Sequence, residues 1–197
     1  MIDVIIPDEK IFHFINVLNN TNELIRLIEM DYKNITDEDC VGRWLDWSTS
    51  DGYQFGFRKE INSHKLNTSS DNSYKIFNLL DGAISKCIEN YMSLSNNNVG
   101  FRTAFGISKY NVGSEMGKHV DDYEDYDKNP TVSGILYLND NYQGGELYFE
   151  NQGIKIKPPA GSMVIFPSIK PYFHESLKVI DGTKYMCTVF CYTDKVI

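Results

Sequence analysis

The sequence lacks the features of a secreted or membrane-spanning protein. It has four cysteines in 197 residues, none of them in a Cys-x-x-Cys pair, so neither a disulfide framework nor a zinc site is predicted. No stretch approaches the roughly 18 apolar residues that a membrane-spanning helix needs. The first ten residues also lack the basic start and apolar core of a signal peptide. These absences predict a cytoplasmic protein with no membrane partner.

Basic charge is also scarce, whereas aromatic residues are abundant. Lysine and arginine total 19 against 27 aspartates and glutamates, which gives a formal net charge of -8. Because nucleic-acid binding relies on a basic surface, no nucleic-acid partner is predicted. The 13 tyrosines and 11 phenylalanines favour strands and a well-filled interior. The length fits one domain whose core needs no disulfide support.

The N-terminal half carries mainly helical patterns. A short strand over residues 4–6 is predicted to stop at Pro7, where a helix then opens that carries Ile11, Phe14 and Leu18 on one face. A second helix is predicted to begin at Thr21. A third, long and amphipathic, follows Ser70 and is predicted to lie across the back of a sheet. Its apolar repeat consists of Tyr74, Phe77, Leu80, Ile84, Ile88 and Tyr91.

The C-terminal half changes to short β runs separated by turn residues. Turn signals stand at residues 144–145, 158–161 and 181–182. The predicted strands cover residues 102–110, 119–123, 132–138, 146–149, 154–156, 162–166, 174–179 and 184–192. Short strands after a helical block predict a mainly β fold with α: a double-stranded β-helix, or jelly roll, with N-terminal helices packed outside.

The segment over residues 32–70 is polar but contains both tryptophans, Trp44 and Trp47, and an alternating aromatic run that ends at Arg58. This alternation predicts a strand or hairpin flanked by loops. Exposed aromatics beside a binding site suit a loop that covers a substrate. Packing of the same aromatics against the sheet explains the pattern equally well.

A candidate metal site lies in the C-terminal half. His119 and Asp121 are two positions apart, so on an extended segment their side chains point to the same face. His174 could supply a second imidazole, and two histidines with one carboxylate are typical of non-haem Fe(II) oxygen chemistry. A His-x-Asp pair alone is common on protein surfaces. Lys184, after a turn, could hold the distant acid group of a metal-bound dicarboxylate.

A series of motifs stands in order along residues 101–193. They are Tyr110-Asn-Val-Gly113, His119-Val-Asp121, Tyr137-Leu-Asn139, Gly144-Gly-Glu-Leu-Tyr-Phe149, Pro158-Pro-Ala-Gly-Ser162, Phe166-Pro167, His174 and Gly182-Thr-Lys184. With these motifs the segment resembles the Fe(II)- and 2-oxoglutarate-dependent dioxygenases of the prolyl 4-hydroxylase type. A lysine at position 184, where other branches use arginine, is closer to collagen and algal prolyl 4-hydroxylases and their bacterial or viral relatives.

The resemblance implies a distorted double-stranded β-helix that holds Fe(II) through His119, Asp121 and His174. No catalytic residue beyond the metal centre is implied. Lys184 and Tyr110 would bind the distal carboxylate of the cosubstrate, 2-oxoglutarate, although an ordinary core tyrosine is the alternative for Tyr110. Lesser cosubstrate contacts are expected from Thr188 and Leu147. On this reading residues 1–197 form a single oxygenase domain, with 1–99 as helical support and lid and 100–197 as the catalytic jelly-roll core.

The implied reaction is hydroxylation of prolyl residues in a peptide or protein, which consumes O2 and 2-oxoglutarate and yields succinate and CO2. Ascorbate is a further candidate cofactor. The loops over residues 32–70 and 122–129 are predicted to close over the substrate. The candidate contacts are Trp47, Tyr53, Arg58 and Tyr123. Two alternatives stay open: an oxygenase of a free amino acid or other small molecule, and a non-catalytic, cupin-like metal-binding jelly roll.

Overall fold

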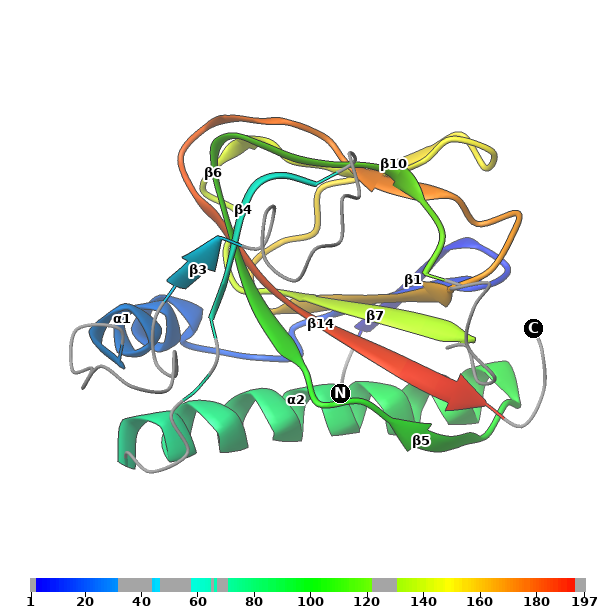
Figure 1. Ribbon diagram of the computed structural model, residues 1–197. Helices are drawn as coiled ribbons and strands as arrows, with labels where there is room; N and C mark the ends of the chain where they lie inside the picture. The colour runs from blue at the N-terminus through cyan, green and yellow to red at the C-terminus, as the bar shows by residue number, and fades with distance from the viewer. Residues whose placement is uncertain are drawn as a thin grey trace.

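The computed structural model describes residues 3–31, 44–46, 58–64, 66, 71–121 and 131–193. Twelve strands form one curled, predominantly antiparallel sheet, and two helices lie outside it (Figure 1).

The first strands and both helices come from the N-terminal half. They are β1 (Asp3–Asp8), β2 (Ile11–Ile15), α1 (Thr21–Asp31), β3 (Trp44–Asp46), β4 (Arg58–His64) and α2 (Asp71–Ser95). The remaining strands are β5 (Val99–Arg102), β6 (Gly106–His119), β7 (Val132–Tyr137), β8 (Gln143–Gly144), β9 (Leu147–Phe149), β10 (Ile154–Ile156), β11 (Ser162–Pro167), β12 (His174–Ser176), β13 (Val179–Asp181) and β14 (Lys184–Thr193).

The strand order of the large sheet is β1-β2-β11-β7-β14-β6-β12-β9-β10, with β5 on β14 and the β3–β4 pair on β6. A second sheet holds only β8 and β13.

The central strands are buried on both faces and supply two separate cores. Along β11, Met163 and Ile165 join a core that includes α1 and α2, whereas Val164 and Phe166 join a second core inside the curled sheet. This alternation follows from the period of two in a strand. β7, which is buried throughout, contributes to both cores in the same way. The second core therefore fills the concave side of the sheet.

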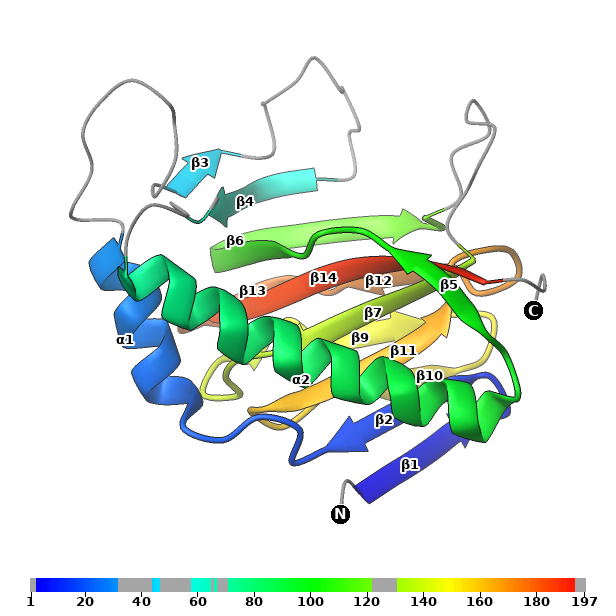
Figure 2. The same cartoon turned by 90° about the horizontal axis from the view of Figure 1, so that it is seen from below.

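Helix α2 covers one face of the sheet, as predicted, and runs diagonally across its strands (Figure 2). Its buried face consists of Ser73, Ile76, Leu80, Ala83, Ile84, Cys87, Ile88 and Tyr91. The prediction that Tyr74 and Phe77 belong to this face is wrong, because both side chains are exposed. Phe77 instead stacks on Phe105, with ring centroids 5.4 Å apart.

The helix predicted after Pro7 is also wrong. The segment forms strand β2, whose residues Ile11, Phe12 and Phe14 are all buried. β2 pairs with β11 on one side and with β1 on the other. A short apolar run is compatible with either structure, and the pairing partners in the C-terminal half decide it. Pro7 lies inside the edge strand β1, where its missing N–H costs no ladder hydrogen bond.

The predicted break between a strand ending at Tyr110 and one starting at His119 does not exist. β6 runs without interruption from Gly106 to His119. The separate strand predicted over residues 119–123 is wrong for the same reason, since His119 ends β6 and no described strand follows before β7. Within residues 32–70, β3 pairs antiparallel with β4, and β4 pairs with β6. The aromatic run before Arg58, from which a strand or hairpin was predicted, lies outside the described residues. The division of the domain at residue 99 stays a prediction.

Candidate functional site

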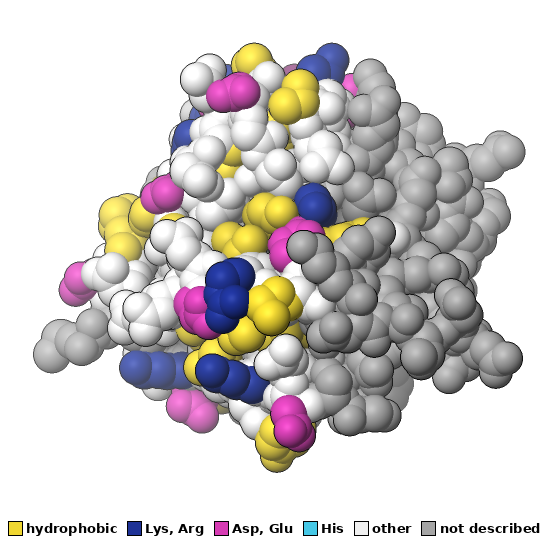
Figure 3. All heavy atoms as spheres, turned by 90° about the vertical axis from the view of Figure 1, so that its left-hand side faces the viewer, with side chains coloured by type: hydrophobic (Ala, Val, Ile, Leu, Met, Phe, Trp, Pro, Cys, Tyr) yellow, Lys and Arg dark blue, Asp and Glu magenta, His cyan; other side chains and the backbone are white. Residues whose placement is uncertain are grey.

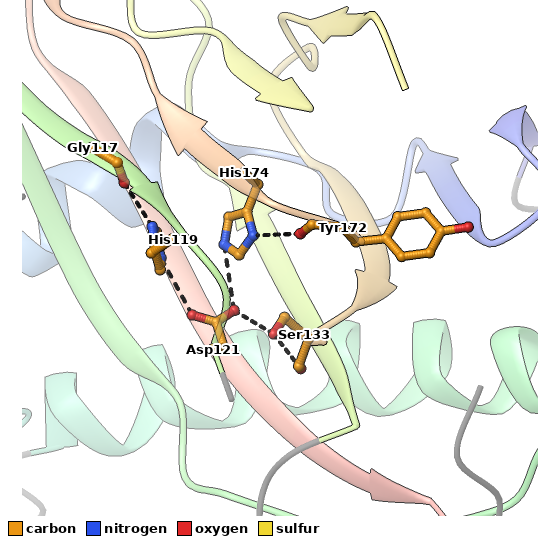
Figure 4. A network of polar contacts seen from close by, with 7 residues as sticks. Gly117, His119, Asp121, Ser133, Tyr172 and His174 are labelled. Atoms are coloured by element: carbon orange, nitrogen blue, oxygen red, sulfur yellow. Dashed lines mark hydrogen bonds and ion pairs between the residues drawn. The ribbon is translucent and has the colours of Figure 1, made fainter. Parts of the chain in front are cut away.

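His119 and His174 come from strands that pair side by side. His119 is the last residue of β6, His174 is the first of β12, and the antiparallel register puts them opposite each other. Their ring centroids are 4.3 Å apart. Asp121 follows β6 and faces both rings (Figure 4). Its Oδ1 lies 3.3 Å from His119 Nε2, and its Oδ2 lies 3.4 Å from His174 Nε2.

A bulge in this register aims His119 at the site. Ser176 pairs with Met116 and His174 pairs with His119, so β6 holds one more residue than β12 between the two pairs. Met116 and His119 are an odd number of positions apart, and in a regular strand they would face opposite sides of the sheet. Both nevertheless line the same cavity. The extra residue therefore turns His119 inward, as bulges next to active sites often do.

Each imidazole is fixed through its Nδ1 atom. His119 Nδ1 lies 2.8 Å from the Gly117 carbonyl oxygen, and His174 Nδ1 lies 3.3 Å from that of Tyr172. A carbonyl oxygen only accepts, so Nδ1 carries the proton in each neutral ring and Nε2 presents a lone pair. Burial lowers the pKa of His174 to about 4, which keeps that ring neutral at pH 7.

Asp121 is buried as a carboxylate. Burial raises its pKa, but the nearby His174 and His119 and a hydrogen bond from Ser133 together bring the pKa below its usual value. Ser133 Oγ donates to Asp121 Oδ2 at 2.5 Å and contacts Ser168 Oγ at 2.7 Å. Neither Ser133 nor Ser168 was predicted as a site residue, because a serine in a buried strand and another after a strand carry no recognisable motif.

The donor set fits a divalent iron ion. One ligand atom from each of His119, Asp121 and His174 lies within 4.8 Å of the others. Two imidazole Nε2 atoms and the carboxylate oxygens converge on one point, where they can offer lone pairs to a single cation. This combination of neutral imidazole and carboxylate is the one used by non-haem Fe(II) oxygenases. Among the described residues, this is the one group of three or more His, Cys, Asp or Glu side chains that converges in this way.

Lys184, the first residue of β14, is fully buried beside this group. Its Nζ donates to the Gly145 carbonyl oxygen and to Ser176 Oγ, both at 2.8 Å. These two contacts use two of the three N–H bonds of an ammonium group. Burial lowers the pKa of Lys184 to about 7, although Glu146 acts to raise it. A buried cation in this state gains from pairing with an anionic ligand.

Two tyrosines flank the Lys184 ammonium. Nζ lies 4.9 Å from the ring centroid of Tyr110 and 5.4 Å from that of Tyr137. Burial raises the pKa of Tyr137 well above its usual value, and its hydroxyl has no hydrogen-bond partner among the described residues. Tyr137 was not predicted as a site residue, although it opens the Tyr137-Leu-Asn139 motif. The motif could therefore have pointed to the Tyr137 hydroxyl as a further polar group near Lys184.

One cavity joins the metal-ligand group to Lys184. Its lining, which is mostly apolar, consists of Tyr110, Met116, His119, Val120, Asp121, Ile135, Tyr137, Leu147, His174, Ser176, Lys184, Met186, Thr188 and Phe190. Leu147 and Thr188, expected as lesser cosubstrate contacts, thus line the cavity. Phe149 and Phe166 pack around His174, with ring centroids 6.0 and 4.6 Å from its imidazole.

Of the four predicted substrate contacts, the structure describes only one. Trp47, Tyr53 and Tyr123 lie outside the described residues. Arg58 begins β4, and its backbone pairs with Met116 of β6. Since Met116 lines the cavity, the start of β4 lies next to the strand that carries His119. The roles of these four residues stay predictions.

The sequence comparisons identify the class of this domain. Residues 105–192 match the family model of the 2OG-Fe(II) oxygenase superfamily. A PKHD-type hydroxylase of Prochlorococcus marinus strain NATL2A is 30% identical over 139 residues, which cover 66% of this chain and 62% of the relative. A PKHD-type hydroxylase of Xanthomonas campestris pv. campestris strain B100 is 34% identical over 92 residues, covering 40% of this chain and 39% of the relative. The chain spans less than two thirds of the length of these relatives.

Residues 105–192 therefore match the model of a 2OG-Fe(II) oxygenase domain, in agreement with the resemblance recognised from the motifs. Its relatives are hydroxylases of the PKHD type. Within the described part of the chain, neither helix is both long enough and apolar enough to cross a membrane.

Solved structures confirm the predicted jelly-roll fold. A prolyl hydroxylase from Trichoplax adhaerens, in complex with a peptide fragment of the hypoxia inducible factor oxygen degradation domain, aligns with a TM-score of 0.68 at 19% identity, over 93% of this chain and 84% of that one. The viral collagen prolyl hydroxylase of Paramecium Bursaria Chlorella virus-1, in its 2OG complex, aligns with a TM-score of 0.63 at 16% identity, over 92% and 95% of the two chains. A Pseudomonas putida prolyl-4-hydroxylase aligns with a TM-score of 0.62 at 18% identity, over 93% of this chain and 92% of that one.

Proposed function

We propose that the protein is an Fe(II)- and 2-oxoglutarate-dependent hydroxylase. The observation that carries this proposal is that a two-histidine, one-carboxylate group and a fully buried lysine line the same cavity. A protein that only binds a metal has no need of a buried ammonium at that place. An enzyme whose cosubstrate is a dicarboxylate needs both groups.

In this proposal His119, Asp121 and His174 hold the iron, and Lys184 pairs with the distal carboxylate of 2-oxoglutarate. When bound, iron and 2-oxoglutarate activate O2 and hydroxylate a C–H bond, with succinate and CO2 as coproducts. The Tyr110 ring covers the Lys184 ammonium, and the apolar cavity lining excludes water and orients the ligands.

For the substrate we propose a prolyl residue in a peptide or protein. This rests on the names of the similar structures, all of them prolyl hydroxylases, one of which is bound to a peptide. Trp47, Tyr53, Arg58 and Tyr123 are the proposed contacts. On the described part of the face seen in Figure 3, lysine and arginine side chains lie among acidic and hydrophobic ones and form no continuous basic patch. This distribution supports a peptide rather than a nucleic-acid partner, in line with the proposed cytoplasmic location.

The experiment is to incubate the protein with Fe(II), 2-oxoglutarate, ascorbate and a set of proline-containing peptides, and to measure succinate and peptide mass. We expect succinate to form together with a peptide that has gained one oxygen atom. His174→Ala should abolish both signals, whereas His13→Ala should keep them, because His13 is equally buried (5% exposed against 4% for His174) but does not line the cavity.

Other outcomes would replace the proposal in part or in full. Oxygen addition to free proline or another small molecule, with no peptide modified, would make the protein a small-molecule hydroxylase. Binding of Fe(II) without any succinate, under all these conditions, would point to a non-catalytic jelly roll that only binds a metal.

A further inference from the structure

The Asp121 carboxylate is held by two serines from other parts of the sheet. Ser133 is on β7 and Ser168 directly follows β11, and both are fully buried. The Ser133 hydroxyl donates to Asp121 Oδ2, and the two serine oxygens are 2.7 Å apart. The backbone N–H of Asp121 also donates to the Ser168 carbonyl oxygen at 2.9 Å. Figure 4 shows the Asp121 carboxylate between Ser133 and the two imidazoles.

The direction of the hydroxyl contacts follows from proton counting. A serine hydroxyl has one proton, and an ionised carboxylate can only accept. The Ser133 proton is therefore given to Asp121, so Ser168 must donate its own proton to Ser133. The contacts form a directed chain in which Ser168 orients Ser133 and Ser133 orients the carboxylate. Hydrogen bonds to a charged acceptor are the stronger kind.

This arrangement differs from that of the two histidines. Each imidazole is fixed by a backbone carbonyl from two residues earlier in its own segment, Gly117 for His119 and Tyr172 for His174. Asp121 lies beyond the end of β6, and the hydrogen bond from its N–H to the Ser168 carbonyl oxygen holds its backbone but not its carboxylate. Among the described residues, the hydroxyl that orients its carboxylate comes from Ser133. The position of the carboxylate therefore depends on side chains that can be exchanged without altering the backbone.

We propose that Ser133 and Ser168 are positioning residues that hold Asp121 in the orientation required for metal binding, with the Ser168 hydroxyl acting only through Ser133. The inference rests on the proposed function, because it assumes that His119, Asp121 and His174 hold the metal. Partners that orient metal ligands typically contribute ten- to hundred-fold in metal affinity. The serine chain should contribute to the affinity for the ion in addition to the stability of the fold.

The test is to titrate the whole protein with Co(II) and to record both the dissociation constant and the visible absorption of the bound ion. Ser133→Ala should weaken Co(II) binding roughly ten- to hundred-fold and change the spectrum, and Ser168→Ala should weaken it less. Ser162→Ala is the matched control, because Ser162 is also fully buried and donates its hydroxyl to the Pro159 carbonyl oxygen but lies outside the cavity lining. The control should leave affinity and spectrum unchanged.

The double variant Ser133→Ala/Ser168→Ala tests the direction of the chain. It should bind Co(II) as the Ser133→Ala protein does, since Ser168 has nothing to orient once Ser133 has lost its hydroxyl. If the losses of Co(II) affinity in the two single variants add up in the double variant, the directed chain is overturned. Equal Co(II) binding by the wild-type and Ser133→Ala proteins, with urea unfolding showing both folded, would overturn the positioning role. If the wild-type protein itself binds no Co(II), the proposed function fails first, so the two failures are distinguishable.

Discussion

The carbonyl oxygen of Gly145 accepts a hydrogen bond from Lys184 Nζ, and the missing side chain of the same glycine leaves space for the lysine chain. A Cβ atom at position 145 would lie 3.3 Å from Lys184 Cδ and 3.1 Å from a ring carbon of Tyr142. Gly145 also has a φ of +67°, which side-chain-bearing residues rarely adopt. One residue thus both binds the ammonium group and makes room for it.

Gly145→Ala should therefore weaken 2-oxoglutarate binding by about tenfold, equivalent to roughly 1.4 kcal/mol, and should destabilise the fold. The added Cβ pushes Lys184 away from the anchoring position. Isothermal titration of the metal-loaded protein with 2-oxoglutarate measures the affinity, and urea unfolding measures the stability.

Gly153→Ala is the matched control for this change. Gly153 has a similar φ of +64°, but nothing lies within 4 Å of the position its Cβ would take. Both variants should lose about 1–2 kcal/mol of stability from the strained backbone. Only Gly145→Ala should lose 2-oxoglutarate affinity. An equal effect of both variants on affinity would show that the contact between Gly145 and Lys184 plays no part in cosubstrate binding.

The affinity for 2-oxoglutarate should depend on pH through Lys184. Because burial lowers the pKa of Lys184 to about 7, the ammonium that pairs with a carboxylate is fully present only below pH 7. As the pH rises above 7, the dissociation constant should increase by up to tenfold per pH unit, since binding must then take up one proton. The measurement is a titration of metal-saturated protein between pH 6.5 and 9.

Lys184→Met provides the comparison for the pH dependence. Its affinity should be lower at pH 6.5 and nearly constant over the same range, because no group that loses its proton faces the distal carboxylate. His174, with a pKa of about 4, stays neutral throughout. A wild-type affinity that does not change with pH would remove Lys184 from the role of anion anchor.

Helix α2 allows a comparison between adjacent residues of the same type. Leu80 is fully buried in the core between α2 and the sheet, whereas Leu79 is 42% exposed. Leu80→Ala should lower the free energy of unfolding by about 2–5 kcal/mol through the cavity it leaves. Leu79→Ala should change it by about 0.5 kcal/mol or less. Urea unfolding of both variants checks this, and equal losses would contradict the assigned buried face.

Substrate binding should protect two segments from hydrogen exchange at the same time. The segments are residues 32–70 and 122–129, which carry the predicted contacts Trp47, Tyr53 and Tyr123. A proline-containing peptide, added with an inert 2-oxoglutarate analogue, should slow exchange in both segments, while free proline should not. Protection confined to the strands, or equal protection by free proline, would favour a small-molecule substrate.

The candidate metal-ligand group was predictable from the sequence because its residues belong to short motifs that follow one another in order along the chain. His119 and Asp121 share a motif, and the later turn and Lys184 complete a recognisable series. The serines that hold Asp121 were not predictable, since Ser133 lies in a buried apolar strand and nothing in the sequence links it to Ser168. Their contact exists only because β7 and β11 are neighbours in the sheet.

The fold class was also predictable, because the short β runs and turn residues of the C-terminal half are local patterns. The structure of the N-terminal segment was not predictable. The run that contains Ile11 and Phe14 fits either the helical period or a strand buried on both faces. The choice depends on β11, which pairs with β2 and lies in the other half of the chain. Similarly, the continuity of β6 between Tyr110 and His119 depends on its pairing with β4, β12 and β14.

The bulge between Met116 and His119 makes the candidate metal site sensitive to the number of residues in β6. Side chains along a strand alternate between faces, so the face that His119 occupies is a question of odd or even count. The extra residue of β6 opposite β12 changes that count. Deleting Gly117 would leave His119 two positions from Met116, still on the inner face of a regular strand, but would remove the carbonyl oxygen that fixes its Nδ1. Inserting one residue while the bulge is retained would instead turn the imidazole to the convex side of the sheet. The length of this short stretch of β6 is therefore constrained more tightly than that of a surface loop.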